Sequence, residues 1–287
     1  MIGFNHIATM GRLGNQMFQH AATKGIARKV GTNYCIPPDN RTDIQIDNYG
    51  LFDAFQMKNV DAIQFLNNGN APIVQERHFH FDEELFELCP DHVSLHGFFQ
   101  TEKYFKHVES EIREDYTFKS EWMDPCKEFM SQFDGQEVAF LHVRRGDPNL
   151  VDKRGFKWAY VNCSDQHPVQ PLEYYEEAIK HIPEDIPILV FSDSIDWVKE
   201  QDFFTGDRFM FSEPEDKFED GALVPYVDLC LMSLCSHAII ANSSLSWWGA
   251  WLQENVNKTV VAPKMWFGTA YAQHDTKDLI PDNWIIV

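Results

Sequence analysis

The sequence predicts an α/β protein built from two doubly wound domains of parallel sheet. Three observations support this fold class. Short apolar runs alternate with helical segments through the second half, the polar segment 131–136 separates two such regions, and 287 residues suffice for two ordinary domains. We therefore expect an N-terminal domain over residues 1–135 and a C-terminal domain over 136–287, with a ligand bound in a cleft where the strand ends of the two domains face each other.

The first half opens with an apolar run, a glycine-containing turn and an amphipathic segment. Met17, Phe18 and Ile26 are spaced for one helical face, and Gly31 is a typical helix stop. Residues beyond this helix are less regular. The expected elements of this half are strands at 3–8 and 78–81 and helices at 15–30, 102–113 and 125–133.

The second half alternates more cleanly between strand and helix patterns. This alternation is typical of a parallel sheet covered on both faces. The expected strands are 137–143, 188–192, 208–211, 237–241 and 259–262. The expected helices are 172–182, 196–200, 224–234 and 244–252.

Charge and composition limit the function classes. The formal net charge is -20, from 24 basic and 44 acidic side chains, which argues against nucleic acid or an anionic membrane as a general partner but permits a nucleotide in a local basic pocket. The six cysteines contain no C-x-x-C pair, so we expect reduced, structural thiols. No secretory signal is recognisable, and no apolar run reaches the roughly 18–20 residues of a membrane span. We expect a cytoplasmic protein, or one held peripherally at a membrane surface.

The most informative motif runs from His142 to Asp147 and contains Arg144 and Arg145. It follows an apolar run that reads as a buried strand. Ligands of open α/β sheets bind beyond the carboxyl ends of strands, and arginine matches phosphate through two parallel N–H···O bonds. The pair is therefore a candidate diphosphate clamp. The alternative is a surface cluster of ion pairs.

A second candidate lies at the turn before the first helix, where Gly11 and Gly14 are followed by Asn15. Glycine permits close approach of the backbone, and a helix N-terminus favours an anion. The spacing differs from that of a dinucleotide-binding fingerprint. The alternative is an ordinary turn with Asn15 as the helix N-cap.

Asn242, Ser243 and Ser244 form a third candidate, because they join an expected strand to an expected helix. Their hydroxyl and N–H groups could meet an anion, or the serines could simply cap the helix. Trp247 and Trp251, four residues apart on that helix, are expected to be packing residues.

Two carboxylates also follow or open predicted elements. Asp228 opens an apolar helix, where it could complement the helix dipole or accept two N–H bonds from a guanine edge. Asp193 follows a strand and could contact a ribose or base, or cap the next helix. Metal signals are weak, since His78 and His80 lack a third ligand at a recognisable spacing and no Asp-x-Asp occurs. No metal or other cofactor is expected.

Taken together, these motifs resemble the α-1,2-fucosyltransferases of glycosyltransferase family 11. The matching blocks, in order along the chain, are 11–19, 97–105, 142–147, 191–193 and 228–252. The resemblance implies a two-domain GT-B fold, GDP-fucose as the donor, inversion at the anomeric carbon and no metal requirement. It also implies an acceptor-side domain over 1–135 and a GDP-fucose-binding domain over 136–287. The acceptor would be a galactose-terminated glycan; neither its identity nor the oligomeric state can be read from the chain.

The wider fucosyltransferase superfamily suggests individual roles. Asp228 would contact the guanine, His142 would lie beside the guanosine, and Arg144 would hold the β-phosphate. Ser243 and Ser244 would lie near that phosphate. The remaining implied donor-binding residues are Gly14, Asn15, Arg145, Asp193 and Asn242.

The expected reaction is a single displacement at the fucose anomeric carbon, with Arg144 stabilising the leaving diphosphate. Asp152 stands where a related α-1,6 enzyme carries its base, and Asp147 is closer to the arginine pair, so both are candidate bases. The alternatives are a fucosyltransferase of other linkage or acceptor, protein included, and a non-catalytic relative that binds GDP or glycan.

Overall fold

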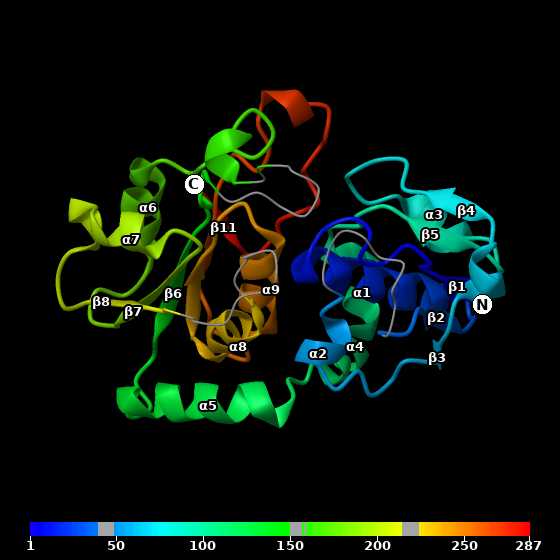
Figure 1. Cartoon of the computed structure of the whole chain (residues 1–287), viewed down its shortest axis with the longest axis horizontal. Helices are drawn as coiled ribbons and strands as arrows, with labels where there is room; N and C mark the ends of the chain where they lie inside the picture. Colours follow the sequence, from blue (N-terminus) through cyan, green and yellow to red (C-terminus); the bar gives the residue numbers. More distant parts are fainter. Residues whose placement is uncertain (40–48, 150–156, 158, 214–223) are drawn as a thin grey trace. The chain divides into compact units, whose positions relative to one another are not determined.

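The computed structural model describes residues 1–39, 49–149, 157, 159–213 and 224–287 (Figure 1). Its contacts divide the chain into two compact units. The first unit contains Met1–Lys119 and His274–Pro281, and the second contains Ser120–Gln273 and Asp282–Val287. Within the described ranges, no helix combines the length and apolar character needed to cross a bilayer.

The first unit contains a five-stranded parallel sheet in the order β3-β2-β1-β5-β4. The central strand β1 therefore has its sequence successor β2 on one side and the later strand β5 on the other. Ligands of open parallel sheets bind at such a reversal of strand order. The strands are β1 Ile2–Gly3, β2 Tyr34–Ile36, β3 Ala62–Ile63, β4 Ile73–Gln75 and β5 Ser94–His96.

The helices of this unit depart from the sequence prediction at two places. The first helix begins at Leu13 rather than Asn15, and the expected helix over 102–113 is divided into two 3-10 turns and a short α-helix. The expected strand at 78–81 does not form. The helices are α1 Leu13–Lys29, α2 Leu51–Ala54, α3 Glu83–Leu88 and α4 Glu109–Asp115, with 3-10 turns at Leu66–Gly69, Glu102–Tyr104 and Lys106–Val108.

The second unit contains a six-stranded parallel sheet in the order β11-β10-β9-β6-β7-β8. Here β6 is the strand where the order reverses, because β7 lies on one side and β9 on the other. The strands are β6 Ala139–Val143, β7 Ile188–Ser192, β8 Phe209–Phe211, β9 His237–Ile239, β10 Val260–Ala262 and β11 Ile285–Ile286.

Helices cover both faces of this second sheet, with α6 and α7 on one side and α8 and α9 on the other (Figure 1). This arrangement is the doubly wound one that the sequence predicts. The helices are α5 Ser120–Met130, α6 Leu172–Ala178, α7 Ile195–Lys199, α8 Tyr226–Leu234 and α9 Ser244–Leu252. The 3-10 turns are Ser131–Phe133, Tyr160–Asn162, Ile179–His181, Asp202–Phe204 and Thr269–Tyr271.

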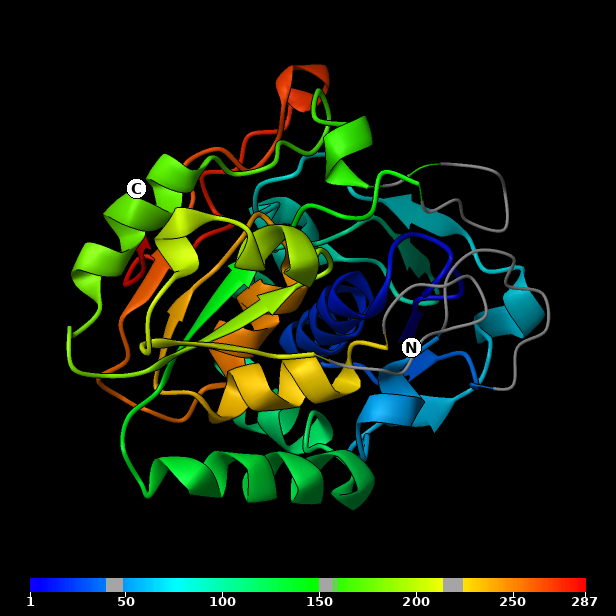
Figure 2. The same cartoon turned by 60° about the vertical axis from the view of Figure 1, so that its left-hand side comes forward.

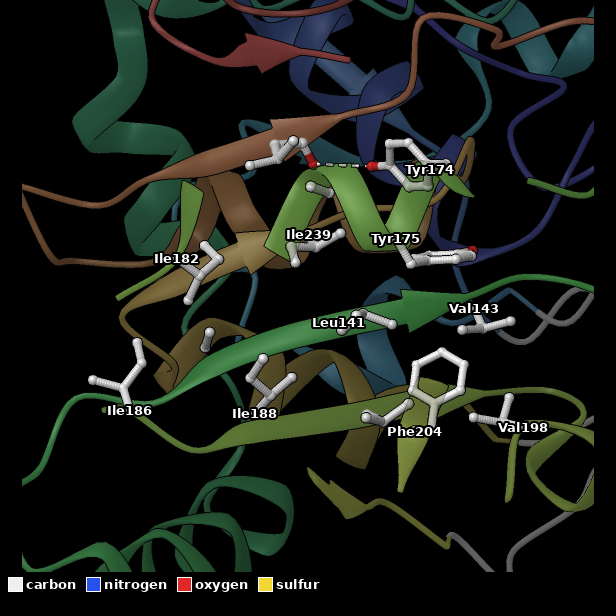
Figure 3. Close-up of a cluster of buried hydrophobic side chains, with 14 residues drawn as sticks. Leu141, Val143, Tyr174, Tyr175, Ile182, Ile186, Ile188, Val198, Phe204 and Ile239 are labelled. Carbon is white, nitrogen blue, oxygen red and sulfur yellow. Dashed lines mark hydrogen bonds between the residues drawn. The ribbon is translucent and has the colours of Figure 1, made fainter. Parts of the chain in front are cut away.

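A buried apolar cluster fixes α6 against the second sheet (Figure 3). Leu141 and Val143 of β6 pack into it with Tyr174 and Tyr175 of α6. The Tyr174 hydroxyl donates to the carbonyl of Ile240, just beyond β9, at 2.6 Å and lies 3.3 Å from the carbonyl of Val261 in β10, which ties α6 to the sheet. Because side chains alternate along a strand, His142 points to the opposite face of the sheet from this cluster.

Contacts place the boundary between the units earlier than the expected 135/136. Helix α5 lies alongside α8 in both views (Figures 1 and 2). Trp122 of α5 packs against Tyr226 with ring centroids 5.2 Å apart, and the Cys126 thiol donates to the carbonyl of Val227 at 3.7 Å. The second unit therefore begins at Ser120. A linker of polar residues does not mark a boundary when the helix before it packs on the later domain.

A buried ion pair holds α1 in the first unit. The Lys24 ammonium and the Asp115 carboxylate are both fully buried and lie 2.7 Å apart. Asp115 also accepts the backbone N–H of Asn59 at 2.7 Å. Both ring nitrogens of the neighbouring His20 bond to tyrosine hydroxyls, and burial lowers the pKa of His20 to about 4, so its ring is neutral.

Neutralising Asp115 leaves the buried Lys24 ammonium with only the partly exposed Glu111 carboxylate, 3.3 Å away. Asp115→Asn is therefore expected to lower the free energy of unfolding of the first unit by about 3–5 kcal/mol, measured by denaturant titration. Glu109→Gln, which breaks the partly exposed i,i+4 ion pair with Arg113, is the control and should change it by no more than about 0.5 kcal/mol. Equal effects of the two substitutions would contradict this account of Asp115.

Candidate functional site

The loop that follows β6 is fixed by one carboxylate, that of Asp193 at the end of β7. Its Oδ1 accepts the backbone N–H groups of Arg145 at 2.9 Å and Gly146 at 2.8 Å, and its Oδ2 pairs with the Arg144 guanidinium. Gly146 has a φ of +80°, and a Cβ there would lie 2.7 Å from Ala159 Cα, so the turn requires glycine. Asp193 therefore sets both the loop conformation and the direction of Arg144.

The Arg144 side chain is 28% exposed and its guanidinium lies over the ring of Tyr160, 5.1 Å from the ring centroid. Burial raises the pKa of Tyr160, so its hydroxyl is neutral and donates to the carbonyl of Asn242 at 3.1 Å. The Tyr160 ring also stacks with the His167 ring, with the ring centroids 5.0 Å apart. Tyr160 thus connects the loop after β6 with the loop after β9.

Arg145 has different surroundings from Arg144. Its guanidinium lies over the ring of Trp197 in α7, 4.2 Å from the centroid. This cation–π contact holds Arg145 against the helix that follows β7. The two adjacent arginines are therefore anchored by different elements.

The segment between β9 and α9 presents polar atoms at the carboxyl end of the sheet. Asn242 is 2% exposed, and its Nδ2 donates to the carbonyls of Pro168 at 2.9 Å and Trp266 at 3.1 Å. Its Oδ1 is buried and has no hydrogen-bond partner within the part of the chain that the structure describes. A buried amide oxygen without a partner needs an explanation, and a bound ligand is one.

Ser243 occupies the N-cap position of α9 but its side chain makes no capping hydrogen bond. The reading of this serine as an ordinary cap is therefore wrong. Ser244 is the first helical residue and is partly exposed. Trp247 and Trp251 are both buried, with rings stacked at 6.4 Å, which confirms that they are packing residues.

Asp228 lies in the first turn of α8 and is 8% exposed. The hydroxyl of Ser212, just beyond β8, donates to its Oδ1 at 2.7 Å. Burial raises the pKa of Asp228 to about 6, despite this hydrogen bond. The carboxylate is therefore ionised at neutral pH, with Ser212 bonded to one of its two oxygens.

His142 is buried on β6, and its Nδ1 has no hydrogen-bond partner among the described residues. Burial lowers the pKa of His142 to about 4, so the ring is neutral. The exposed Asp147 accepts the N–H of Asn149 at 2.8 Å, while the carboxylate paired with Arg144 is that of Asp193. Asp152 lies outside the described residues.

The first unit carries the remaining predicted residues. Gly11 has a φ of +85°, and a Cβ there would meet the Asn15 amide at 1.9 Å. Arg12 is the N-cap residue of α1, so Gly14 and Asn15 lie inside the first turn and the expectation of Asn15 as the cap is wrong. Instead, Asn15 Oδ1 accepts from the Gln100 amide at 2.7 Å.

Sequence reasoning missed three residues that hold these loops. Tyr160 carried no signal, because an aromatic residue in an irregular segment has no characteristic period. Gln16 accepts the N–H of Gly50 at 2.9 Å, and Gln19 donates to the carbonyls of Met10 and Gly97 at 3.2 and 3.1 Å. Both glutamines belong to the block 11–19. Polar side chains on a buried helix need hydrogen-bond partners, and that was the available signal.

For metal binding, the described ranges contain no group of three or more histidine, cysteine, aspartate or glutamate side chains placed to hold an ion. His78 and His80 stack with ring centroids 4.8 Å apart in an irregular segment. They do not alternate along a strand, as the sequence had suggested.

The two backbone hydrogen bonds to Asp193 stabilise the loop after β6 to a measurable extent. Asp193→Ala removes the acceptor of the Arg145 and Gly146 amides, so their hydrogen exchange should accelerate by about 10- to 100-fold, measured by NMR without nucleotide. Asp147→Ala, which removes an exposed carboxylate of the same loop, is the control and should leave these two amides unchanged. Unchanged exchange in Asp193→Ala would show that the carboxylate does not hold the loop.

Known proteins resemble this chain over most of its length. The family model described as glycosyl transferase family 11 matches residues 1–287. An α-1,2-colitosyltransferase of Escherichia coli is 29% identical, with 96% of each chain covered. A galactoside α-(1,2)-fucosyltransferase 2 of Bos taurus is 23% identical, covering 86% of this chain and 68% of the relative.

Among solved structures, the NodZ α-1,6-fucosyltransferase co-crystallised with GDP superposes with a TM-score of 0.55 at 14% identity. The match covers 88% of this chain and 92% of that one. At this identity the likeness concerns the fold, which is of the GT-B type that the family resemblance implied.

Proposed function

The chain belongs to glycosyl transferase family 11, and from that membership we propose that it is an α-1,2-fucosyltransferase. It transfers L-fucose from GDP-fucose to the 2-hydroxyl of a galactose-terminated glycan, with inversion and without a metal. The observation that carries the proposal is the Arg144 guanidinium, held by Asp193 at the carboxyl end of β6. Arginine in a fixed orientation at this edge of a sheet suits a diphosphate.

In the proposed reaction the acceptor hydroxyl oxygen bonds to the anomeric carbon as the bond from that carbon to the diphosphate oxygen breaks. The electron pair of the broken bond leaves with GDP, and the hydroxyl proton passes to a base or to water. Negative charge therefore grows on the diphosphate in the transition state. Arg144 and the N-terminus of α9, at Ser243 and Ser244, stabilise that charge.

The contacts refine the roles of the other donor-binding residues. Asp193 acts by orienting Arg144, because both of its oxygens are already occupied within the protein. Arg145 has a supporting role against Trp197. Asn242 offers the ligand its buried Oδ1, and His142 offers its Nδ1 beside the guanosine.

The remaining roles stay as the sequence suggests. Asp228 accepts the guanine N–H groups, and the turn at Gly14 and Asn15 contacts the diphosphate. Neither Asp147 nor Asp152 is assigned as the base. Asp147 lies exposed and bonded within its own turn.

GDP-colitose is a second candidate donor, because one relative at 29% identity is named a colitosyltransferase. Colitose is fucose without its 3-hydroxyl, so the two donors present the same GDP group. The contacts described above all concern that group and do not separate the two sugars.

The proposal is tested by measuring GDP release from GDP-fucose and GDP-colitose with a panel of β-galactosides, lactose included, in EDTA. We expect fucose transfer in EDTA and an α-1,2 linkage in the isolated product, assigned by NMR. Arg144→Ala is expected to lower kcat by about 10²- to 10³-fold, because a preorganised donor to the leaving group is lost.

Arg113→Ala is the matched control, since Arg113 is partly exposed and pairs with Glu109 within α4. It should retain wild-type turnover. Near-normal turnover by Arg144→Ala would refute the clamp, and preference for GDP-colitose would replace the donor sugar. Loss of activity in EDTA that an added divalent ion restores would refute metal independence.

The buried Asp228 predicts a pH dependence of GDP binding. Only the ionised carboxylate accepts two guanine N–H groups, so affinity is nearly full from about one pH unit above the pKa of about 6 and falls as the pH drops through it. The Kd should rise about tenfold per pH unit below that value. The free energy of unfolding changes in the opposite sense. It rises as the pH falls through this pKa, because burial disfavours the ionised form of Asp228.

This dependence is measured by calorimetric titration with GDP between pH 5 and 8. GDP has its own phosphate titration, so Asp228→Asn supplies the baseline: it should bind more weakly and show the phosphate contribution alone. If the variant and the wild type have pH profiles of the same shape, Asp228 does not contact the base.

A further inference from the structure

Four aromatic rings, which we call the aromatic cluster, gather at the carboxyl edge of the second sheet, beside the loop that carries Arg144. Tyr160 and His167 lie between β6 and α6, and Phe267 and Tyr271 follow β10. The His167 ring stacks on that of Tyr160. Its centroid also lies 5.8 Å from that of Phe267 and 5.6 Å from that of Tyr271. All four residues are partly exposed, so the cluster forms a surface rather than a part of the core.

Asn242 anchors the segments that carry these rings. Its backbone carbonyl accepts the Tyr160 hydroxyl at 3.1 Å. Its side-chain Nδ2 donates to the carbonyls of Pro168 and Trp266, each of which directly follows or precedes a residue of the aromatic cluster. Asn242 also belongs to the segment between β9 and α9 that the proposed function assigns to the donor. Direct hydrogen bonds therefore tie the aromatic cluster to the candidate donor site.

The two segments of the aromatic cluster are also bonded to each other. The Gly268 N–H donates to the carbonyl of Gln166 at 2.9 Å, and the Tyr271 hydroxyl donates to the Gln166 amide oxygen at 3.2 Å. The Ala270 N–H donates to the carbonyl of Asp165 at 2.7 Å. A Cβ at Gly268 would lie 2.3 Å from the carbonyl oxygen of Asp165, so this close approach requires glycine. The aromatic surface is thus held in place before any ligand binds.

The strand order gives the donor a direction along this edge of the sheet. Under the proposed function Asp228 contacts the guanine, and its partner Ser212 lies just beyond β8. The diphosphate lies at Arg144, after β6, and at Ser243, after β9. The next strand in the sheet is β10. The sugar, which is bonded to the phosphate farther from the nucleoside, therefore continues towards the loop after β10 that carries Phe267.

His167 supplies polar atoms within the aromatic cluster. Among the described residues its ring contacts other rings, and its nitrogens make no hydrogen bond. Burial lowers the pKa of His167, and the charge of Arg144 lowers it further, so the ring is neutral at neutral pH. A neutral imidazole has one N–H donor and one acceptor nitrogen. Either nitrogen suits a sugar hydroxyl, which both donates and accepts.

We propose that the rings of His167, Phe267 and Tyr271 bind the donor sugar through its deoxygenated edge, and that a ring nitrogen of His167 hydrogen-bonds one of its hydroxyls. The inference rests on the proposed function and names the residues that recognise the sugar rather than GDP. Carbon 6 of fucose is a methyl group, which packs against aromatic rings without leaving a polar atom unpaired. Colitose has the same methyl group, so the inference holds for either donor. Tyr160 is a positioning residue, because its ring contacts both His167 and Arg144.

The deoxygenated edge is tested by calorimetric titration with GDP-fucose and GDP-L-galactose. L-Galactose is fucose with a hydroxyl on carbon 6, so the two donors differ only at this edge. We expect GDP-L-galactose to bind the wild type about 10- to 100-fold more weakly, because its 6-hydroxyl meets aromatic carbon and loses its water. Equal Kd values for the two donors would overturn the proposal.

Two variants test the residues. Phe267→Ala removes part of the apolar surface, so we expect the Kd for GDP-fucose to rise about tenfold. His167→Phe keeps a ring in the stack but removes both nitrogens, so the Kd for GDP-fucose should rise about 3- to 10-fold. In both variants the Kd for GDP should stay within about twofold of wild type, because GDP alone does not reach these side chains.

Phe133→Ala is the matched control. Phe133 is a partly exposed ring of the second unit that packs on Phe129 and precedes β6, at the amino end of the strands. This variant should bind GDP and GDP-fucose with the wild-type Kd values. GDP binding shows whether each variant is folded, and if one does not fold the other carries the test. A folded variant at the aromatic cluster with the wild-type Kd for GDP-fucose overturns the proposal. An equal rise in both Kd values, as a merely structural role predicts, also overturns it.

Binding also separates failure of this inference from failure of the proposed function, because the titration needs no acceptor. If the wild type transfers no sugar but the two variants lose affinity for GDP-fucose as expected, the inference stands and the proposed transfer fails. If the wild type transfers fucose while the folded variants keep the wild-type Kd for GDP-fucose, the proposed function stands and the inference fails. A wild type that binds neither GDP nor GDP-fucose contradicts both.

Discussion

The carboxylate of Asp193 is the constraint on which the candidate donor site depends. It accepts two backbone N–H groups of the loop after β6 and pairs with the guanidinium that the loop carries. Loop conformation and arginine direction are therefore set together and cannot vary independently. Tyr160 extends this constraint to the next loop, because its ring lies under Arg144 and its hydroxyl bonds the carbonyl of Asn242. Three strand ends are thus held as one rigid edge.

The two units solve the same problem in different ways. Each sheet has a strand at which the order reverses, and in each the loops at that reversal are held by side-chain hydrogen bonds. In the second unit the brace is the anionic Asp193, which suits a loop that carries a cation. In the first unit the amide of Gln19 donates to the carbonyls of Met10 and Gly97, and the carboxyl group of Glu76 accepts the N–H groups of Phe98 and Phe99.

The sequence predicts regular elements well where packing decides them. The strand 188–192 and the helix 244–252 are found at their predicted bounds, because continuous apolar runs between turn residues leave little choice of register. The first unit was harder, since its strands have only two or three residues and the alternation at 78–81 has no partner strand. The candidate site divides similarly. Its position beyond β6 follows from the motif, whereas the function of Asp193 as an internal acceptor depends on contacts over 47 to 49 positions of sequence separation.

An acidic chain that binds a diphosphate cannot rely on net charge. Because Asp193 pairs with Arg144, the positive charge of the guanidinium is already balanced, and the chain carries -20 in all. Long-range attraction for an anion is therefore weak, and affinity for GDP under the proposed function must come from short-range, directed hydrogen bonds. The donors available are those arginine N–H groups that Asp193 does not use and the N-terminal amides of α9, where Ser243 makes no side-chain cap. Such donors cost little reorganisation when charge grows on the leaving group, which is why rigidity of this edge, rather than its charge, is the property that the fold maintains.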